Sequence, residues 1–156
     1  MKFINSSNDL SVYLDLEIVK NIPINNVSID TRTIKKESLF IAIKGDKFDG
    51  NNFVEEAFAR GASIAVVDNK KFLKTRKKNI IYVKNTINAL KKISENIIKQ
   101  YEGNVIAITG SNGKTTTTNI IANSLNNTSK TLGTYNNEIG MPLSIINASP
   151  NSKNIV

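Results

Sequence analysis

The spacing of apolar and polar residues predicts that short strands and helices alternate along the first hundred residues. The continuous apolar run at 39–43 predicts a strand buried on both faces. Shorter apolar runs predict further strands at 27–32, 63–67 and 80–83. Residues 51–61 predict a helix with an asparagine cap and with Gly61 as its stop. Strands alternating with helices indicate an α/β sheet domain.

A longer amphipathic pattern follows these strands. Isoleucine and leucine recur at three- and four-residue steps between lysines, which predicts a helix over about 86–101. We place a domain boundary near residue 102, which gives an N-terminal domain at 1–102 and the beginning of a second α/β domain at 103–156. The weakly patterned residues before position 27 predict only a small edge element.

The next pattern is a strand, a glycine-bounded polar loop and a helix. We expect a buried strand over 104–109, the loop at 110–113 and a helix over about 114–125. Gly110 and Gly113 allow backbone amides to approach an anion, and the start of the following helix adds its positive dipole end. This order of elements predicts a phosphate-binding loop of the P-loop type, although the chain has Ile108 where the common G-x-x-x-x-G-K-[ST] pattern has glycine.

The residue types in this loop suit ATP and Mg²⁺. Lys114 offers a mobile charge for the β- and γ-phosphates, and the hydroxyl of Thr115 is a candidate Mg²⁺ ligand. We therefore predict that Lys114 is catalytic. The predicted ATP-binding set is Gly110, Ser111, Asn112, Gly113, Lys114, Thr115 and Thr116. The alternative is a tight strand-to-helix turn without a ligand.

Composition narrows the possible chemistry. The 156 residues contain no cysteine and no histidine, so any metal must be bound by oxygen atoms. No apolar stretch is long enough to cross a bilayer, and the first residues do not resemble a signal peptide, so we expect a cytoplasmic protein.

The net charge of +8 has a local source. Much of the excess lies in the lysine-rich stretch 70–78, which we interpret as a solvated connection. The alternative, a patch for polyanions, lacks the interleaved aromatic residues of single-strand binders, and we expect no nucleic-acid partner.

Residues 103–156 are too few to form a nucleotide-binding sheet that is covered on both faces. We therefore expect the chain to be the N-terminal part of a longer protein. The apolar pair at 155–156 suits the start of another strand.

Three stretches together resemble the Mur ligase family, ATP-dependent enzymes that add amino acids or dipeptides to the UDP-N-acetylmuramoyl precursor of peptidoglycan. Residues 27–32 with 39–53 resemble the N-terminal UDP-binding domain, with its D-[ST]-R element and its G-D-x-x-D-G loop. Residues 109–116 resemble the short phosphate loop of the family. Residues 136–142 are similar to the N-N-[DE]-I-G-x-P element typical of the MurF branch, whereas the MurE branch usually has a threonine-rich element there.

The resemblance implies which residues contact the nucleotide-sugar. The implied substrate-binding set is Asp30, Thr31, Arg32, Gly45, Asp46, Lys47, Phe48, Asn136 and Asn137. The alternative for Asp30 and Arg32 is an ion pair that supports a turn, and the alternative for the two asparagines is a turn. The family often has histidine after the D-G pair, and this chain has Asn51 there, so one substrate contact is weakened or replaced.

The resemblance also implies the reaction of the complete enzyme. ATP phosphorylates the terminal carboxylate of UDP-N-acetylmuramoyl-tripeptide, and the amine of D-alanyl-D-alanine attacks the acyl phosphate to give an amide, ADP and phosphate. The adenine pocket, the acidic Mg²⁺ ligand and the C-terminal domain of the family lie beyond position 156, so we expect this chain alone to be an inactive monomer. The alternatives are a MurE-type ligase that adds one diamino acid, or a UDP-sugar-binding module without catalysis.

Overall fold

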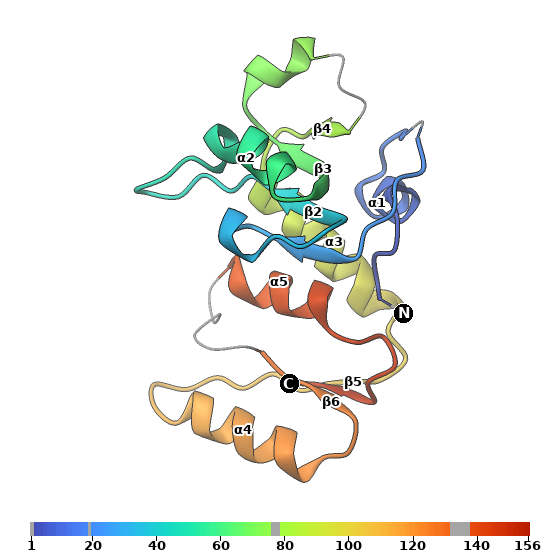
Figure 1. Cartoon of the computed structure of the whole chain (residues 1–156). Coiled ribbons are helices and arrows are strands. Elements are labelled where there is room, and N and C mark those ends of the chain that lie inside the picture. Colours follow the sequence, from blue (N-terminus) through green and yellow to red (C-terminus); the bar gives the residue numbers. More distant parts are fainter. Residues whose placement is uncertain (1, 19, 76–78, 132–137) are drawn as a thin grey trace.

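The computed structural model describes residues 2–18, 20–75, 79–131 and 138–156, and it contains two parallel sheets (Figure 1). The first sheet has the order β1-β2-β3-β4, formed by Asn26–Ser28, Ser38–Ile41, Ala62–Val67 and Ile80–Tyr82. The second has the order β5-β7-β6, formed by Asn104–Val105, Asn154–Ile155 and Thr128–Ser129. Every pairing is parallel.

Helices connect and cover these strands. The α-helices are α1 (Ser7–Leu14), α2 (Val54–Ala59), α3 (Thr86–Gln100), α4 (Lys114–Ser124) and α5 (Gly140–Asn147). Short 3-10 helices are η1 (Thr31–Thr33), η2 (Gly50–Phe53) and η3 (Lys70–Lys74). The predicted α/β class is confirmed. Within the described residues, no helix has both the length and the apolar character needed to cross a membrane.

The first sheet is buried on both faces, as the apolar run at 39–43 predicted. Leu39 and Ile41 on β2 belong to a core with side chains of α1, α3 and α5. Phe40 and Ala42, which alternate with them, belong to a second core with α2. The central strands therefore hold one layer of helices on each side (Figure 1).

Helix α3 forms where the three- and four-residue apolar spacing predicted it. The side chain of Asn85 caps its first turn by accepting a hydrogen bond from the amide of Asn88 at 2.8 Å. Leu90, Ile93 and Ile97 are fully buried along its inner face. This helix covers the first sheet over most of its length (Figure 1).

The predicted edge element before position 27 is a helix. Ser6 and Asp9 form a capping box at the start of α1. The side chain of Ser6 accepts a hydrogen bond from the backbone of Asp9, and the side chain of Asp9 accepts one from the backbone amide of Ser6. Lys92 and Asn96 of α3 donate to the backbone oxygens of Leu14 and Tyr13 at the end of α1. Helix α1 thus lies beside α3 on one face of the sheet.

The predicted asparagine cap at the start of 51–61 is wrong. The side chain of Asp49 caps η2 by accepting from the amide of Asn51, and α2 follows without a side-chain cap. Gly61 ends this region as predicted, because its φ of 109° belongs to the left-handed region that glycine favours.

Helix α5 was not predicted. It packs against α3 and β1, and its Ile146 is only 2% exposed within the core that α1 and α3 share. Residues beyond position 102 therefore pack with the first sheet. The domain boundary near 102 stays a prediction.

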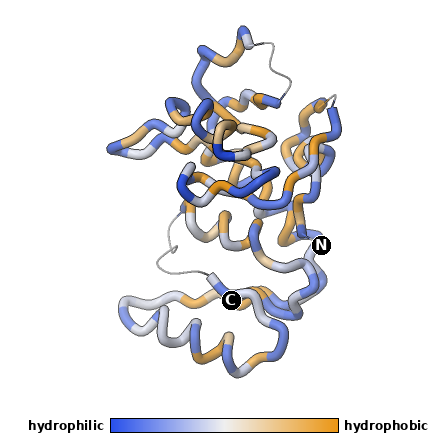
Figure 2. Tube along the Cα trace, viewed as in Figure 1, coloured by the Kyte–Doolittle hydropathy of each residue, from blue (hydrophilic) through white to orange (hydrophobic). Residues whose placement is uncertain are grey.

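The predicted buried strand over 104–109 is wrong. Strand β5 contains only Asn104 and Val105, both exposed. Ile106 still donates to the backbone oxygen of Ile155 at 2.8 Å, but no described residue pairs with 107–109. The second sheet is also poorly covered, because none of the residues of α4 is buried and the helix mixes hydrophilic and hydrophobic positions (Figure 2). The predicted strand at 155–156 forms as β7, between β5 and β6.

We predict that Leu90→Ala lowers the free energy of unfolding by about 2–5 kcal/mol, because it leaves a cavity at a fully buried position. Leu73→Ala is the matched control, since Leu73 is 57% exposed and its truncation is expected to change stability by less than about 0.5 kcal/mol. Urea denaturation followed by circular dichroism measures both. Equal losses in the two variants would contradict the position of the core.

Candidate functional site

The turn after β1 is organised by the hydroxyl of Ser28. This buried oxygen accepts a hydrogen bond from the amide of Asp30 at 3.0 Å and donates to the backbone oxygen of Asp30 at 2.9 Å. It also lies 2.7 Å from the hydroxyl of Thr33. These bonds hold the chain in the sharp bend that begins η1.

Asp30 and Arg32 form an ion pair within this turn. The guanidinium of Arg32 donates to both carboxylate oxygens of Asp30, at 2.5–3.0 Å, and the amide of Arg32 donates to Oδ1 at 2.9 Å. The side-chain hydrogen bond from Arg32 is the main cause that lowers the pKa of Asp30. The ion pair given as the alternative for these two residues is therefore present. The side chain of Arg32 is nevertheless largely exposed and also lies beside the cavity described next.

A cavity of about 610 Å³ lies between this turn and the loop that follows β2. Asp30, Thr31 and Arg32 line it together with Phe48. Its polar wall also contains Glu56 and Arg60, which form an ion pair at 2.8 Å, and Thr31 donates to Glu56 at 3.0 Å. Phe40, Ile43 and Phe53 add apolar surface. A pocket of this size with an apolar floor and a few polar groups suits a nucleotide-sized ligand.

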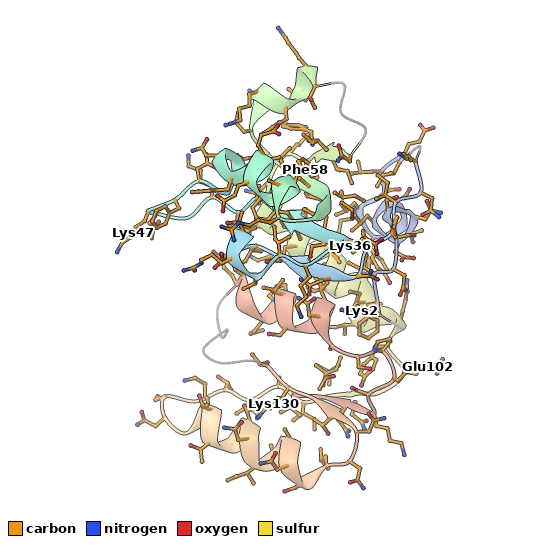
Figure 3. The ribbon with its side chains drawn as sticks, viewed as in Figure 1. Lys2, Lys36, Lys47, Phe58, Glu102 and Lys130 are labelled. Carbon is orange, nitrogen blue, oxygen red and sulfur yellow. The ribbon has the colours of Figure 1, made fainter. Side chains whose placement is uncertain are left out.

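The loop after β2 places only one of its four predicted residues at this cavity. Lys44 and Asp49 pair across the base of the loop, and the amide of Gly45 donates to the backbone oxygen of Phe48 at 2.9 Å. Phe48 lines the cavity although it is 71% exposed. Lys47 projects away from the body of the molecule at the tip of the loop (Figure 3). Gly45, Asp46 and Lys47 do not line the cavity.

Asn51 is buried and acts as a structural link. Its side chain donates to Asp49 at 2.8 Å and to Asp68 at 2.9 Å, and its oxygen accepts from the amides of Asp68 and Asn69. The hydrogen bond from Asn51 is the main cause that lowers the pKa of Asp49. The carboxylate of Asp68 also accepts from the amide and hydroxyl of Thr86. The sequence analysis did not identify this network. Asn51 lies 17 residues before Asp68 in the chain, and Asp68 lies 18 residues before Thr86.

The loop at 110–113 is exposed and leads directly into α4. Gly113 precedes the helix with φ 78° and Gly110 has φ 155°, so two glycines occupy backbone conformations that other residues rarely adopt. Among the residues that the structure describes, none accepts a hydrogen bond from the amides of 111–116. These amides and the positive end of the α4 dipole therefore remain available to an anion.

Lys114 and Thr115 occupy the first turn of α4. The ammonium of Lys114 donates to the backbone oxygen of Gly110 at 2.5 Å, so the side chain folds back over the loop. Thr115 is exposed. No group of three or more acidic residues suited to a metal occurs in the described part of the chain.

Asn136 and Asn137 lie outside the described residues. The description resumes at Glu138, which forms an exposed ion pair with Lys91 of α3 at 2.9 Å. Helix α5 begins two residues later.

Two family patterns match the chain. The one described as "Mur ligase family, catalytic domain" matches residues 23–106, more than half of the chain. The chain belongs to the Mur ligase family. The pattern described as "Mur ligase middle domain" matches residues 108–156 of this Mur ligase chain.

Individual relatives fall into two groups of Mur ligases. The UDP-N-acetylmuramoyl-tripeptide--D-alanyl-D-alanine ligase of Bacillus subtilis (strain 168) is 36% identical over 133 residues, covering 83% of this chain and 29% of the relative. The protein of the same name from Buchnera aphidicola subsp. Baizongia pistaciae (strain Bp) is 35% identical, covering 98% and 34%. The UDP-N-acetylmuramoyl-L-alanyl-D-glutamate--2,6-diaminopimelate ligase of Rickettsia conorii (strain ATCC VR-613 / Malish 7) is 35% identical, covering 81% and 27%. The chain spans about a third of the length of these relatives.

Solved structures of MurF ligases share the fold. The MurF ligase from Thermotoga maritima in complex with ADP has a TM-score of 0.72 at 30% identity, covering 85% of this chain and 31% of that one. MurF from Acinetobacter baumannii has a TM-score of 0.79 at 26% identity, covering 97% and 34%.

We predict that Arg32→Gln raises the pKa of Asp30 toward its ordinary value of 3.8, because the guanidinium bonds are lost. The rise is expected to be incomplete, since the amide of residue 32 and the charge of Arg60 remain. Folding lowers the pKa of Asp30, so its ionised form stabilises the fold above the unfolded pKa. That stabilisation is lost as the pH falls through the folded pKa. The stability difference between wild type and variant should therefore shrink below about pH 4.

Carboxyl-detected NMR titration measures this pKa. Lys36→Gln is the control, because it removes one positive charge from an exposed position that makes no hydrogen bond with Asp30. An unchanged Asp30 titration in Arg32→Gln would show that the ion pair does not form in solution.

Proposed function

We propose that the protein to which this chain belongs is an ATP-dependent ligase that joins D-alanyl-D-alanine to UDP-N-acetylmuramoyl-tripeptide. In this proposal the chain carries the pocket for the nucleotide-sugar and the loop for the terminal phosphates of ATP. Support comes from the names of the Bacillus and Buchnera relatives and from the two MurF structures. The N-N-E-I-G-M-P stretch at 136–142 favours the same branch.

The nucleotide-sugar occupies the 610 Å³ cavity. Thr31 and the backbone of the turn offer donors and acceptors to the edge of uracil, and the ring of Phe48 offers a stacking surface. Arg32 and Arg60 face the diphosphate as cations. The exposed position of Lys47 allows it to approach the ligand only if the loop after β2 closes over the cavity.

The terminal phosphates of ATP lie in the loop at 110–113. The amides of 111–116 donate to phosphate oxygens, and Lys114 exchanges its bond with the Gly110 oxygen for the γ-phosphate. The hydroxyl of Thr115 holds Mg²⁺ together with the phosphates, and the ion supplies charge neutralisation as the phosphoryl group moves.

The observation that carries this proposal is the exposure of the loop amides, which have no partner among the described residues. The first amides of a helix have no intrahelical partner, so in this exposed loop they can donate to phosphate oxygens in place of water. The loop also projects on the same side of the molecule as the loop after β2, at the left of Figure 1. In the proposal, the phosphate donor in one loop reacts with the substrate held beside the other.

A second candidate, a ligase that adds a single diamino acid, is favoured by the Rickettsia relative at 35% identity. The two candidates differ in the amine that they accept. ADP release by the full-length protein, measured with D-alanyl-D-alanine and separately with 2,6-diaminopimelate, distinguishes them.

We predict that the 156-residue chain binds UDP-N-acetylmuramoyl-tripeptide in isothermal titration calorimetry. Lys114→Ala is expected to change this affinity by less than about twofold, since the ammonium lies in the other loop and makes no contact with the cavity. A large loss of affinity in Lys114→Ala would contradict the division between the two loops. Binding of the nucleotide-sugar without any turnover by the full-length protein would favour a binding module instead.

We predict that Lys114→Ala lowers the turnover of the full-length ligase by at least about 100-fold, because it removes a charge that stabilises the moving phosphoryl group. A coupled assay of ADP release measures this. Lys99→Ala is the matched control, since Lys99 is an exposed lysine near the end of α3 and should leave turnover unchanged. Equal turnover in the two variants would remove Lys114 from the mechanism.

A further inference from the structure

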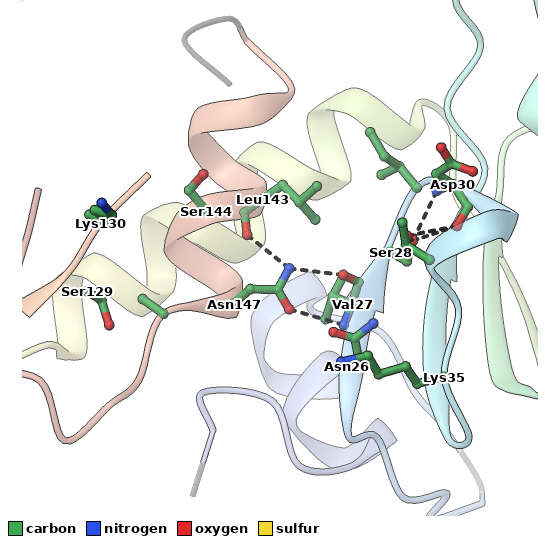
Figure 4. Close-up of a pocket in the computed structure, with 13 residues that line it drawn as sticks. Asn26, Val27, Ser28, Asp30, Lys35, Ser129, Lys130, Leu143, Ser144 and Asn147 are labelled. Carbon is green, nitrogen blue, oxygen red and sulfur yellow. Dashed lines mark hydrogen bonds between the residues drawn. The ribbon is translucent and has the colours of Figure 1, made fainter. Parts of the chain in front are cut away.

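The side chain of Asn147 pairs with the edge of the first sheet. Its oxygen Oδ1 accepts from the amide of Val27 at 3.2 Å, and its nitrogen Nδ2 donates to the backbone oxygen of Val27 at 2.9 Å (Figure 4). Val27 is the middle residue of β1, the edge strand. One amide side chain at the end of α5 therefore takes the place of a neighbouring strand at this residue.

This contact lies one residue from the organiser of the substrate turn. Ser28, which follows Val27, makes the hydroxyl contacts that hold Asp30 and Thr33 in the bend. A shift of the backbone at Val27 is thus transmitted through Ser28 to the residues that line the 610 Å³ cavity.

Apolar packing also holds β1 on this side, since Val27 and Ile146 belong to the same core. A second cavity of about 450 Å³ lies between β1, α5 and β6, lined by Ser28, Lys35, Lys130 and Asn147 among others (Figure 4). Ile146 anchors α5 in this core by apolar contacts, which are not directional. Asn147 adds directional hydrogen bonds between α5 and the backbone of the edge strand to this apolar packing.

We propose that Asn147 is a positioning residue for the nucleotide-sugar, which fixes the Asp30–Arg32 turn through Val27 and Ser28. The inference rests on the proposed function, since it assigns the ligand of that turn. The inference also gives α5 a role. In sequence α5 follows the phosphate loop and β6 and precedes β7. The pocket for one substrate is thereby held by a segment that belongs in sequence to the ATP-binding half.

The test compares Asn147→Leu, which removes both bonds at similar size, with Asn147→Asp, which keeps an acceptor for the Val27 amide and loses the donor. Both are measured in the 156-residue chain at a temperature where circular dichroism shows them fully folded. We expect the Kd for UDP-N-acetylmuramoyl-tripeptide to rise roughly 5- to 30-fold in Asn147→Leu, because the ligand must then order a loosened turn at a cost comparable to one or two net hydrogen bonds. Asn147→Asp should shift in the same direction.

Hydrogen exchange supplies a readout that does not need the ligand. In Asn147→Leu the amides of Val27 and of residues 30–33 should exchange faster than in wild type, whereas the amides of α3 should not. In Asn147→Asp the Val27 amide keeps an acceptor, so the faster exchange should be confined to residues 30–33. Asn151→Ala is the matched control, because no hydrogen bond to the side chain of Asn151 occurs in the described residues. It should change neither the Kd nor the exchange.

The outcomes separate this inference from the proposed function. If folded Asn147→Leu binds with the wild-type Kd, or if faster exchange stops at Val27, Asn147 has only a local structural role and the inference is overturned. If the wild type does not bind the nucleotide-sugar, the proposed function fails, and the exchange of residues 30–33 still decides whether Asn147 positions the turn.

Discussion

Burial of β2 and β3 on both faces is the constraint on which the rest of the structure depends. Leu39 and Phe40 point to opposite cores, so helices must cover both sides of the sheet. Parallel strands joined by such helices bring their carboxyl ends to one edge, where open α/β sheets bind ligands. The turn after β1 and the loop after β2 meet there, and the 610 Å³ cavity lies between them. The site is thus a consequence of strand direction, and its chemistry comes from the residues that the two connections carry.

Local sequence patterns predicted the elements whose formation depends on residues near each other in the chain. The apolar run at 39–43 gave a doubly buried strand, and the spacing around Leu90 gave a long helix with a buried face. The residues of the turn, Asp30 to Arg32, line the cavity because they directly follow a strand, and their contact with a nucleotide-sugar stays a prediction. Asp46 and Lys47 do not line it. The bridge between Lys44 and Asp49 closes the base of their loop, and Lys47 at its tip points away from the body (Figure 3).

The features that sequence reasoning missed all depend on partners distant in the chain. Asn51 was interpreted as a cap or a weakened substrate contact, but its partner is Asp68, which no local pattern connects to it. Helix α5 is short, and its reason to form is the core made by α1 and α3. The predicted strand at 104–109 was too long because a strand also needs a partner strand, which its own apolar run does not supply. An apolar run favours a strand, but within the residues that the structure describes only Asn104 and Val105 have a paired strand beside them.

The position of α5 makes the two halves of the chain mechanically dependent. It follows β6 and precedes β7 in sequence, yet it packs on α3 and β1. Separating the sheet of the phosphate loop from the first sheet therefore requires either extending the links around α5 or pulling Ile146 out of the core. Burial of one such side chain is worth about 1.5–3 kcal/mol, whereas the exposed pair of Lys91 and Glu138 adds less than about 1 kcal/mol. Apolar burial thus holds α5 in place, and Asn147 adds directional hydrogen bonds from α5 to the edge strand.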